Sequence, residues 1–272
     1  MTIAETKHLE VHILGNEVRV EIAETEDQMM EAKVLDDLIF SAHLGITVEE
    51  LVEIMNHGRL LLLRDSEGKL IGESQVITSP ISQHPHLDPD EAYNYGTAIA
   101  PERQNGGVAQ ILFKAQEMVA LEAGKTRSTL TVRLENAPSI RSRFKAGFEV
   151  VGYDPKKYGS VEEDGARLIM EKNLVNPAKN PSNEALRVEI AAGKIPLATD
   201  ENISQILING TPLVGILVKN GDEVDFSAHK LVKKAFKNGN YKGIGLLRAN
   251  GFAPSVDENT GLLVLKHKDF EL

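Results

Sequence analysis

Residues 103–109 read Arg-Gln-Asn-Gly-Gly-Val-Ala, and this glycine-rich stretch lies between a strand-like run and a helix-like run. The strand-like run, residues 92–99, reads Ala-Tyr-Asn-Tyr-Gly-Thr-Ala-Ile. Apolar side chains then recur at positions 108, 111, 112, 115, 118 and 119, and this spacing predicts a helix over residues 108–123. A glycine-rich turn that enters a helix offers free backbone N–H groups at the positive end of the helix dipole. The stretch therefore predicts an anion site, and we expect a ligand that carries phosphate.

The common nucleotide-binding patterns do not account for this loop. No Gly-x-Gly-x-x-Gly follows a first strand, and the chain has no Gly-x-x-x-x-Gly-Lys-Ser/Thr. Instead, Gln104-x-x-Gly107-x-Ala109 follows Ile99-x-Pro101. This arrangement resembles the acyl-CoA pyrophosphate loop of the GNAT superfamily of N-acetyltransferases, whose pattern is Gln/Arg-x-x-Gly-x-Gly/Ala. The alternative interpretation is an ordinary helix N-terminus after a loose turn.

A second motif further along the chain strengthens the resemblance. Residues 131–136 read Thr-Val-Arg-Leu-Glu-Asn, Ser139-Ile140 follows, and Gly147-Phe148 stands eleven and twelve residues past Asn136. The family's second motif is Asn-x-x-Ala/Ser-Ile with Gly-Phe at that distance. Because both motifs occur in the family's order, residues 18–174 are identified as similar to GNAT enzymes.

The predicted elements follow the order of that fold. Capping-box spacing at Thr25-x-x-Gln28 and Thr47-x-x-Glu50 opens two helices. The other predicted elements are a hairpin around Gly15-Asn16, strands over 59–64, 69–78 and 128–135, a helix over 138–146, and strands over 149–152 and 166–171. The resemblance implies an α/β (α+β) fold, with a mixed twisted sheet flanked by helices.

The predicted domains are a GNAT N-acetyltransferase domain over 1–175, a linker over 176–184 and a smaller α/β domain over 185–272. The linker is rich in Pro and Asn. In the last domain we expect a hairpin over 204–218 and a helix over 226–236. The offsets from Asn240 to Ile244 and to Gly251-Phe252 equal those in the second motif, so this domain is interpreted either as a degenerate GNAT-like repeat or as a chance match. It lacks a strand and glycine loop before Asn240, so we expect one coenzyme per chain.

Composition and charge exclude some classes of function but do not identify one. The 272 residues carry a net charge of −10, and 42% are hydrophobic. The chain has no cysteine, which excludes disulfides and a thiolate nucleophile. No apolar run approaches the ~20 residues of a membrane span, and no secretion signal is visible, so a cytoplasmic location is expected. No basic cluster is strong enough for nucleic acid.

The resemblance implies acetyl-CoA as the cosubstrate, without a metal. Backbone N–H groups would hold its pyrophosphate, and the strand before the loop would lie along the pantetheine arm, with an N–H near Ile99 polarising the thioester carbonyl. Asn136 would contact the coenzyme arm, cap the next helix, or do both. The predicted coenzyme-binding residues are Thr97, Ala98, Ile99, Gln104, Asn105, Gly106, Gly107, Val108, Ala109, Gln110, Asn136, Ser139 and Arg143.

The sequence departs from the family at its usual acid and base. Many members have a Tyr seven residues after the Asn, where this chain has Arg143, and some have a Glu five residues before it, where this chain has Thr131. An amine with a pKa of ~10 needs a base before it can attack. The catalytic candidates are Glu73, Glu135 and Tyr95, with Tyr93 as a further one, and either tyrosine would act through a water.

The loop after residue 78 also carries His84-x-His86, Asp88 and Asp90. Nothing downstream completes a metal-ligand set, so we expect this loop to border the acceptor pocket instead.

Together these features predict direct transfer of an acetyl group, in a ternary complex, from acetyl-CoA to a primary amine of a small molecule or a protein. The alternative is an acyl-CoA-binding sensor or interaction module with weak catalysis. Transfer of a longer acyl chain is a third hypothesis. The C-terminal domain is expected either to narrow the pocket or to form a homo-oligomer contact.

Overall fold

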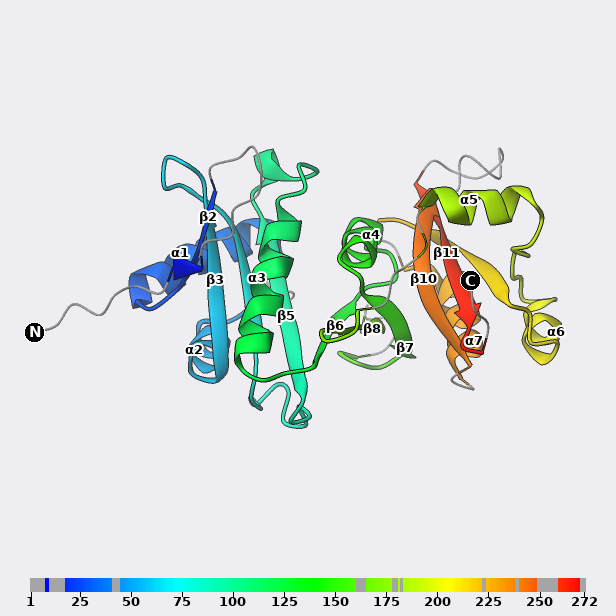
Figure 1. Cartoon of the computed structure of the whole chain (residues 1–272), viewed down its shortest axis with the longest axis horizontal. Coiled ribbons are helices and arrows are strands. Elements are labelled where there is room, and N and C mark those ends of the chain that lie inside the picture. The colour runs from blue at the N-terminus through cyan, green and yellow to red at the C-terminus, as the bar shows by residue number, and fades with distance from the viewer. Residues whose placement is uncertain are drawn as a thin grey trace, which may run out of the picture. The chain divides into compact units, whose positions relative to one another are not determined.

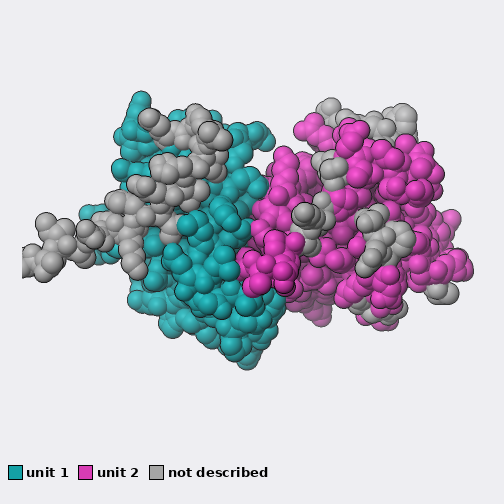
Figure 2. All heavy atoms as spheres, viewed as in Figure 1, with its two compact units in different colours: residues 1–129 teal, residues 130–272 magenta. Residues whose placement is uncertain are grey.

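The computed structural model describes residues 8–9, 18–40, 45–159, 165–177, 181, 183–221, 224–237, 240–248 and 259–269. The predicted turn at Gly15-Asn16 and the Gly251-Phe252 pair lie outside the described residues. The chain forms two compact units, residues 1–129 and residues 130–272, coloured separately in Figure 2. The division falls inside strand β6 (Arg127–Val132).

Unit 1 contains a sheet in the order β1-β2-β3-β4-β5-β6. Neighbouring strands are antiparallel up to β5, and β5 and β6 are parallel. The strands are β1 (His8–Leu9), β2 (Arg19–Ile22), β3 (Gly58–Arg64), β4 (Leu70–Ile77) and β5 (Glu91–Ile99). The helices are α1 (Glu26–Ile39), α2 (Val48–His57), the 3-10 turn η1 (Pro101–Arg103) and α3 (Ala109–Glu122).

The helices of unit 1 cover both faces of this sheet (Figure 1). Ser74 of β4 accepts a hydrogen bond from the Gln116 side chain of α3, at 2.6 Å. Its neighbour Glu73 faces the other way and lies near Asp36 of α1. Because successive side chains of a strand alternate in direction, α3 packs on one face, whereas α1 and α2 pack on the other.

Both predicted capping boxes are present. Thr25 and Gln28 exchange hydrogen bonds at the start of α1, and Thr47 and Glu50 do so at the start of α2. Each box satisfies backbone N–H groups that the first turn leaves without partners. Gly124, predicted to end the helix after the glycine loop, follows α3 with a left-handed φ of 73°.

Unit 2 contains a sheet in the order β6-β8-β7-β10-β11-β9. The strands after β6 are β7 (Glu149–Asp154), β8 (Arg167–Asn173), β9 (Leu213–Lys219), β10 (Tyr241–Arg248) and β11 (Thr260–His267). The helices are α4 (Ala137–Lys145), α5 (Asn183–Ala191), α6 (Ile203–Ile208) and α7 (Phe226–Phe236). The helix predicted over 226–236 is confirmed as α7.

The division of the chain differs from the predicted boundary at 176–184. Val150 of β7 pairs with Gly243 of β10, so the C-terminal segment adds its strands to a sheet that includes β7 and β8. One apolar core joins Phe148 to Val214 and Leu231. The segment 176–184 is therefore a connection inside unit 2. A domain boundary there would separate paired strands and divide a shared apolar core.

Two further predictions for the C-terminal segment are wrong. Residues 204–218 do not form a hairpin, because the first part is α6 and only the second part, β9, is a strand. Residues 241–248, matched to the helix after Asn136, form strand β10, whose apolar residues are buried between two paired neighbours. The predicted repeat of the second motif is therefore not confirmed.

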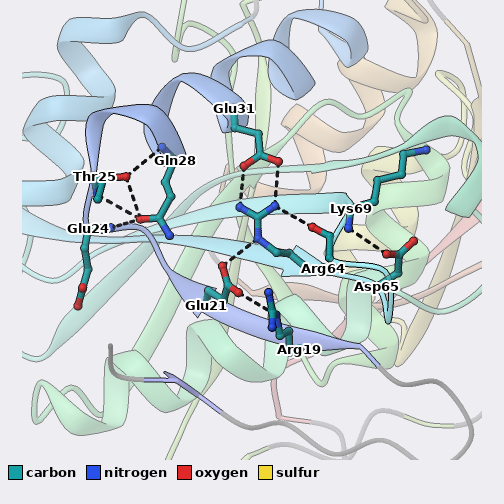
Figure 3. A network of polar contacts seen from close by, with 10 residues as sticks. Arg19, Glu21, Glu24, Thr25, Gln28, Glu31, Arg64, Asp65 and Lys69 are labelled. Carbon is teal, nitrogen blue, oxygen red and sulfur yellow. Dashed lines mark hydrogen bonds and ion pairs between the residues drawn. The ribbon is translucent and has the colours of Figure 1, made fainter. Parts of the chain in front are cut away.

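A buried guanidinium at the end of β3 joins three elements of unit 1 (Figure 3). Arg64 donates two hydrogen bonds to Glu31 of α1 and one, at 2.8 Å, to Glu21 of β2. It also donates to the Gly68 carbonyl in the turn before β4. The side chains of Arg64 and Glu21 are only 10% and 8% exposed. The planar, five-donor guanidinium suits such a junction, because it can satisfy several acceptors at once.

Replacement of Arg64 by Met is expected to destabilise the protein by about 3 kcal/mol, because Glu21 stays buried after it loses this partner. Urea unfolding of parent and variant measures the difference. Lys69→Met is the matched control, since its ion pair with Glu102 is exposed on both sides and should contribute little. Equal unfolding midpoints for parent and Arg64→Met would contradict the expected role of this junction.

Candidate functional site

The glycine loop presents a row of backbone donors. The N–H groups of residues 105–109 bond to no carbonyl in the described part of the chain, whereas those of Gln104 and Gln110 bond to Pro101 and Gly107. Asn105 and Gly107 have left-handed φ angles of 61° and 79°. A Cβ on Gly107 would meet nothing within 4 Å, so the glycine serves the backbone angle and not a tight contact. Successive donors with alternating backbone hand make a concave anion cradle.

The ends of the loop are fixed to the sheet of unit 1. The Gln104 side chain donates to the Ile99 carbonyl at 3.0 Å, which ties the loop to the end of β5. Arg103 pairs with Asp65 at 3.2 Å, and Glu102 pairs with Lys69 at 2.7 Å. Both partners lie in the turn between β3 and β4. The loop therefore starts from a fixed position, although residues 103–107 are exposed.

Strand β5 has a partner on one side only for most of its length. Its pairing with β6 covers three residues, from Glu91 to Tyr93, among the strands that the structure describes. On the other side β5 pairs with β4 as far as Ile99, with a register shift between Ser74 and Val76. Thr97, Ala98 and Ile99 thus lie on the part of β5 that lies beyond its pairing with β6. The oxyanion donor predicted near Ile99 would come from this edge.

A polar network in the sheet stabilises this part of β4 and β5. Ser74 donates to the Gly96 carbonyl at 2.7 Å and lies 2.8 Å from the Thr97 hydroxyl. Gln116 of α3 donates to Ser74 and to the Gln75 carbonyl. These bonds satisfy backbone groups that the register shift removes from the ladder.

Glu73 is a fully buried carboxyl at the same place. It is 0% exposed and accepts a hydrogen bond from the Gln75 side chain. Its second oxygen, Oε1, has no hydrogen-bond partner among the described residues. Burial raises the pKa of Glu73 well above its ordinary value, and the nearby charge of Asp36 adds to that effect, against hydrogen bonds from the Ala98 N–H and Gln75. A carboxyl with a raised pKa can take up a proton near neutral pH.

A further acid, Asp36, lies near Glu73 in unit 1, and Glu50 lies near Asp36. Asp36 of α1 is buried, and it accepts a hydrogen bond from the Ile46 N–H at 2.9 Å. Burial raises the pKa of Asp36, and the charge of Glu50 contributes in the same direction. The predicted catalytic candidate Tyr95 is half-buried and donates to Glu50 at 2.8 Å. The site therefore gathers acidic groups on the α1 and α2 face of the sheet.

Tyr93 and the histidine loop form an aromatic cluster. The Tyr93 ring lies 3.9 Å from the His84 ring, centroid to centroid, and the Tyr95 ring meets His84 edge-on at 5.4 Å. The buried position of Tyr93 in the core with α1 and α2 gives it a packing role. No group of three or more metal-ligating side chains occurs among the described residues, including His86, Asp88 and Asp90.

Glu135 and Asn136 lie in unit 2. Glu135 is 1% exposed and accepts hydrogen bonds from His229 Nε2, at 2.7 Å, and from the Asp225 N–H, at 3.0 Å. Asn136 is exposed, and its side chain caps α4 by accepting from the Ser139 N–H at 3.1 Å. The predicted cap at Asn136 is therefore confirmed, whereas Glu135 has partners that a free base would lack.

The side chain of Arg143 is buried in α4, with its guanidinium 5.5 Å from the centre of the Phe148 ring. Arg143 thus packs as a cation on an aromatic face. Thr131, at the position of the family's glutamate, lies 3.3 Å from the Tyr158 hydroxyl. Tyr158 is half-exposed, and the Arg167 guanidinium lies 5.1 Å from the centre of its ring.

The sequence interpretation missed Asp36, Gln116 and His229. All three are polar residues on the apolar face of a helix: Asp36 follows Ala32 by four positions, Gln116 follows Leu112 by four, and His229 precedes Val232 by three. Helical spacing places each with buried neighbours. A polar residue inside an apolar stripe was thus the available signal, since buried polar groups need partners.

Comparison with known proteins agrees with the motifs. Residues 29–148 match the model of the acetyltransferase (GNAT) family. Residues 29–148 are therefore assigned to a GNAT acetyltransferase domain, which is a domain of the acyltransferase class. The match ends at Phe148 and spans less than half of the chain. No curated protein matches the sequence.

Several solved acetyltransferases are similar over 58–61% of this chain. The ribosomal-protein-S18-alanine N-acetyltransferase from Escherichia coli has 18% identity and a TM-score of 0.48, and 99% of it is covered. An aminoglycoside 6'-acetyltransferase type Ii has 16% identity and a TM-score of 0.47, again with 99% covered. Nourseothricin acetyltransferase has 19% identity, a TM-score of 0.44 and 99% covered. None of these likenesses decides the acceptor of this chain.

None of the helices in the described part of the chain has the length and apolar character that a membrane span requires.

The buried Glu73 makes stability depend on pH in a defined direction. Its folded pKa lies above the unfolded value, so the folded state retains a proton that the unfolded chain releases, and stability falls as pH rises between the two values. Glutamine does not titrate, so Glu73→Gln removes this loss of stability at higher pH. We expect the melting temperature of the variant, relative to the parent, to increase from pH 5 to pH 8. A difference that stays constant with pH would show that Glu73 is not held in its neutral form.

Proposed function

We propose that the protein transfers an acetyl group from acetyl-CoA to a primary amine of a small molecule or a protein, by direct transfer in a ternary complex. The observation that carries this proposal is the loop of residues 105–109. Its five unengaged N–H groups follow directly on β5 in a domain that matches an acetyltransferase family. The anion cradle suits a diphosphate, and the family match points to the diphosphate of coenzyme A.

The coenzyme would be held by this chain's backbone more than by its side chains. The N–H groups from Gln104 to Gln110 would receive the diphosphate oxygens, with the helix dipole of α3 adding to their attraction. Thr97, Ala98 and Ile99 would lie along the pantetheine arm, because the pairing of β6 with β5 covers only Glu91 to Tyr93. Asn136 would contribute an exposed amide, and Ser139 would keep that amide oriented through its N–H.

Glu73 is the base in this proposal. It would accept a proton from the acceptor ammonium through a water molecule, since its carboxyl is buried. The neutral amine then attacks the thioester carbonyl carbon, a C–N bond forms and the C–S bond breaks. The second proton that the nitrogen loses on becoming an amide neutralises the departing thiolate, so coenzyme A leaves as its thiol. This thiol has a solution pKa not far above 7, so its departure needs no strong acid. Glu135 is not retained as a base, because His229 and the Asp225 N–H both bond to its Oε1 and hold its pKa below the ordinary value.

The acceptor would be a cationic amine. Asp36 lies near the proposed base Glu73, and Glu50 lies near Asp36, so carboxyl groups gather in this part of unit 1. Like charges at short range raise the free energy of the empty site, and an ammonium would offset that repulsion. Tyr95 would orient Glu50 for this contact through its 2.8 Å hydrogen bond.

The burial of Glu73 also supports a second function. A carboxyl that is 0% exposed cannot reach an amine without a relay, and the family's usual tyrosine and glutamate positions are Arg143 and Thr131. An acyl-CoA-binding module with weak catalysis would need only the glycine loop. Incubation with acetyl-CoA and a panel of amino acids, polyamines, aminoglycosides and protein N-termini separates the two. Acceptor-dependent thiol release indicates the enzyme, whereas tight acetyl-CoA binding without release indicates the module.

Gly107→Glu is expected to weaken acetyl-CoA binding at least about a hundredfold. The new carboxylate would lie where the diphosphate binds, and two unit charges about 4 Å apart near a surface repel by roughly 4 kcal/mol. Calorimetric titration measures the effect. Gly124→Glu is the control, because Gly124 has a similar left-handed φ of 73° and equal open space at the other end of α3. Unchanged binding by Gly107→Glu would exclude this loop as the coenzyme site.

Glu73→Gln is expected to lower kcat by about 10²–10⁴ while the KM for acetyl-CoA stays unchanged, because a base acts on the acceptor and not on the coenzyme. Steady-state kinetics from pH 5 to pH 9 measure both. Asp36→Asn should move the acidic limb of kcat to lower pH, since the charge of Asp36 raises the pKa of Glu73. Asn keeps an oxygen for the Ile46 N–H. Parent-like kcat in Glu73→Gln would exclude this residue as the base.

A further inference from the structure

A group of C-terminal residues surrounds the short stretch from Glu135 to Ala137, and all of them belong to unit 2. The Gly221 N–H donates to the Glu135 carbonyl at 3.3 Å. The Asn220 side chain accepts from the Ala137 N–H at 3.1 Å. Asp225 and His229 hold the Glu135 carboxylate from α7 and the turn before it. We call Asn220, Gly221, Asp225 and His229 the clamp residues.

The Glu135 carboxylate depends on the clamp residues for its hydrogen bonds. It is 1% exposed, and its Oε1 accepts from His229 and from the Asp225 N–H. Its Oε2 has no hydrogen-bond partner in the described part of the chain. Burial raises the pKa of Glu135, but the hydrogen bonds from His229 and Asp225 outweigh it and leave the pKa below its ordinary value. A buried carboxylate that lost these donors would carry a large desolvation penalty.

The contact continues from His229 to the sheet of unit 2. A carboxylate only accepts, so His229 Nε2 carries the hydrogen toward Glu135, and in a neutral ring Nδ1 then accepts from the Tyr153 hydroxyl at 2.6 Å. Burial, and then the charge of Glu135, raise the pKa of Tyr153, which keeps its hydroxyl protonated as a donor. His229 itself is only 4% exposed. Glu135, His229 and Tyr153 thus form one chain of hydrogen bonds, which fixes the side chains at both ends.

The stretch that is held in this way carries the asparagine assigned to the coenzyme arm. Asn136 lies between Glu135 and Ala137, each of which contacts clamp residues, while its own side chain caps α4. Its φ of −84° and ψ of 65° are outside the helical region, so the capping position is held by its surroundings. Asn220 accepts from the Ala137 N–H, which also donates to the Glu135 carbonyl at 3.0 Å and which the cap at Ser139 does not reach.

We propose that the clamp residues position Asn136 and the first turn of α4 for the acetyl-CoA arm. This inference rests on the proposed function for the identity of the ligand. His229, Asp225 and Asn220 are positioning residues, because they act through Glu135 and Ala137 and touch no substrate. The buried hydrogen bonds order the loop before the coenzyme arrives, and this lowers the entropy lost on binding.

The test compares variants of the full-length chain by two readouts. His229→Ala removes the side-chain donor to Glu135, which keeps the Asp225 N–H. Asn220→Ala removes the side-chain acceptor for the Ala137 N–H, which keeps the Glu135 carbonyl, whereas Asn220→Asp retains an acceptor oxygen. Tyr241→Phe is the matched control, because it removes one buried hydrogen bond of unit 2, from Tyr241 to the Thr211 carbonyl, that does not involve the held stretch. The readouts are the KM and kcat with acetyl-CoA, and hydrogen exchange of the amides of residues 137–140.

We expect His229→Ala and Asn220→Ala to raise the KM for acetyl-CoA about tenfold, with little change in kcat, because ordering of the loop is lost before binding. Their amides at 137–140 should exchange faster than in the parent. Asn220→Asp should restore both values, and Tyr241→Phe should change neither. Thermal melting identifies variants that fail to fold, and Asn220→Ala, at a half-buried position, still decides the question if His229→Ala unfolds.

Parent-like KM in a folded Asn220→Ala variant would overturn the inference, as would an equal rise in KM for Tyr241→Phe, which would show a general loss of stability. If the parent neither binds nor uses acetyl-CoA, the proposed function fails instead. Hydrogen exchange then still tests whether the clamp residues order α4. Unchanged exchange at residues 137–140 in both Ala variants overturns that role, and faster exchange supports it.

Discussion

The antiparallel pairing of β4 with β5 is the constraint on which unit 1 depends. It sets Glu73 opposite Ala98 and Gly72 opposite Ile99, and it positions the start of the glycine loop. The register shift at Gln75 removes backbone groups from the ladder, and Ser74, Thr97 and Gln116 provide their replacement partners. A one-residue slip would turn Glu73 toward α3 and away from Asp36. The position of the proposed base is therefore a property of the register, and the buried polar network keeps that register unique.

Burial raises the pKa of both glutamates considered as bases, but their neighbours leave the two pKa values shifted in opposite directions. Glu73 has an acid near it and few donors, so its pKa rises. Glu135 has His229 and a backbone N–H, so its pKa falls although it is equally buried. The same residue type thus becomes a proton acceptor near neutral pH in one environment and a fixed structural anion in the other. Proximity to the family motif was a poor guide, since Glu135 stands next to Asn136 in the sequence.

The sequence predicted well those features that neighbouring residues decide. Both capping boxes, the helix after the glycine loop and its end near Gly124, the cap at Asn136 and helix α7 are local, and short-range hydrogen bonds or helical periodicity specify them. The errors lie in the C-terminal segment. There the apolar residues of 241–248 fitted a helix by motif offset, but two strand partners on either side made them a strand. Which strands pair depends on residues far apart in the sequence, so local spacing does not predict it.

By itself the sequence determined the family of the first domain, its order of elements and the place of the phosphate loop, because these follow from short motifs at fixed spacing. The tertiary structure alone decided which polar groups meet. Asp36 comes near Glu73 from another element, and His229 reaches Glu135 from 94 residues away in the chain. It also decided that the C-terminal segment shares a sheet and a core with β7 and β8. Such contacts depend on how strands pair and cores close, and the charge state of a buried group follows from the contacts.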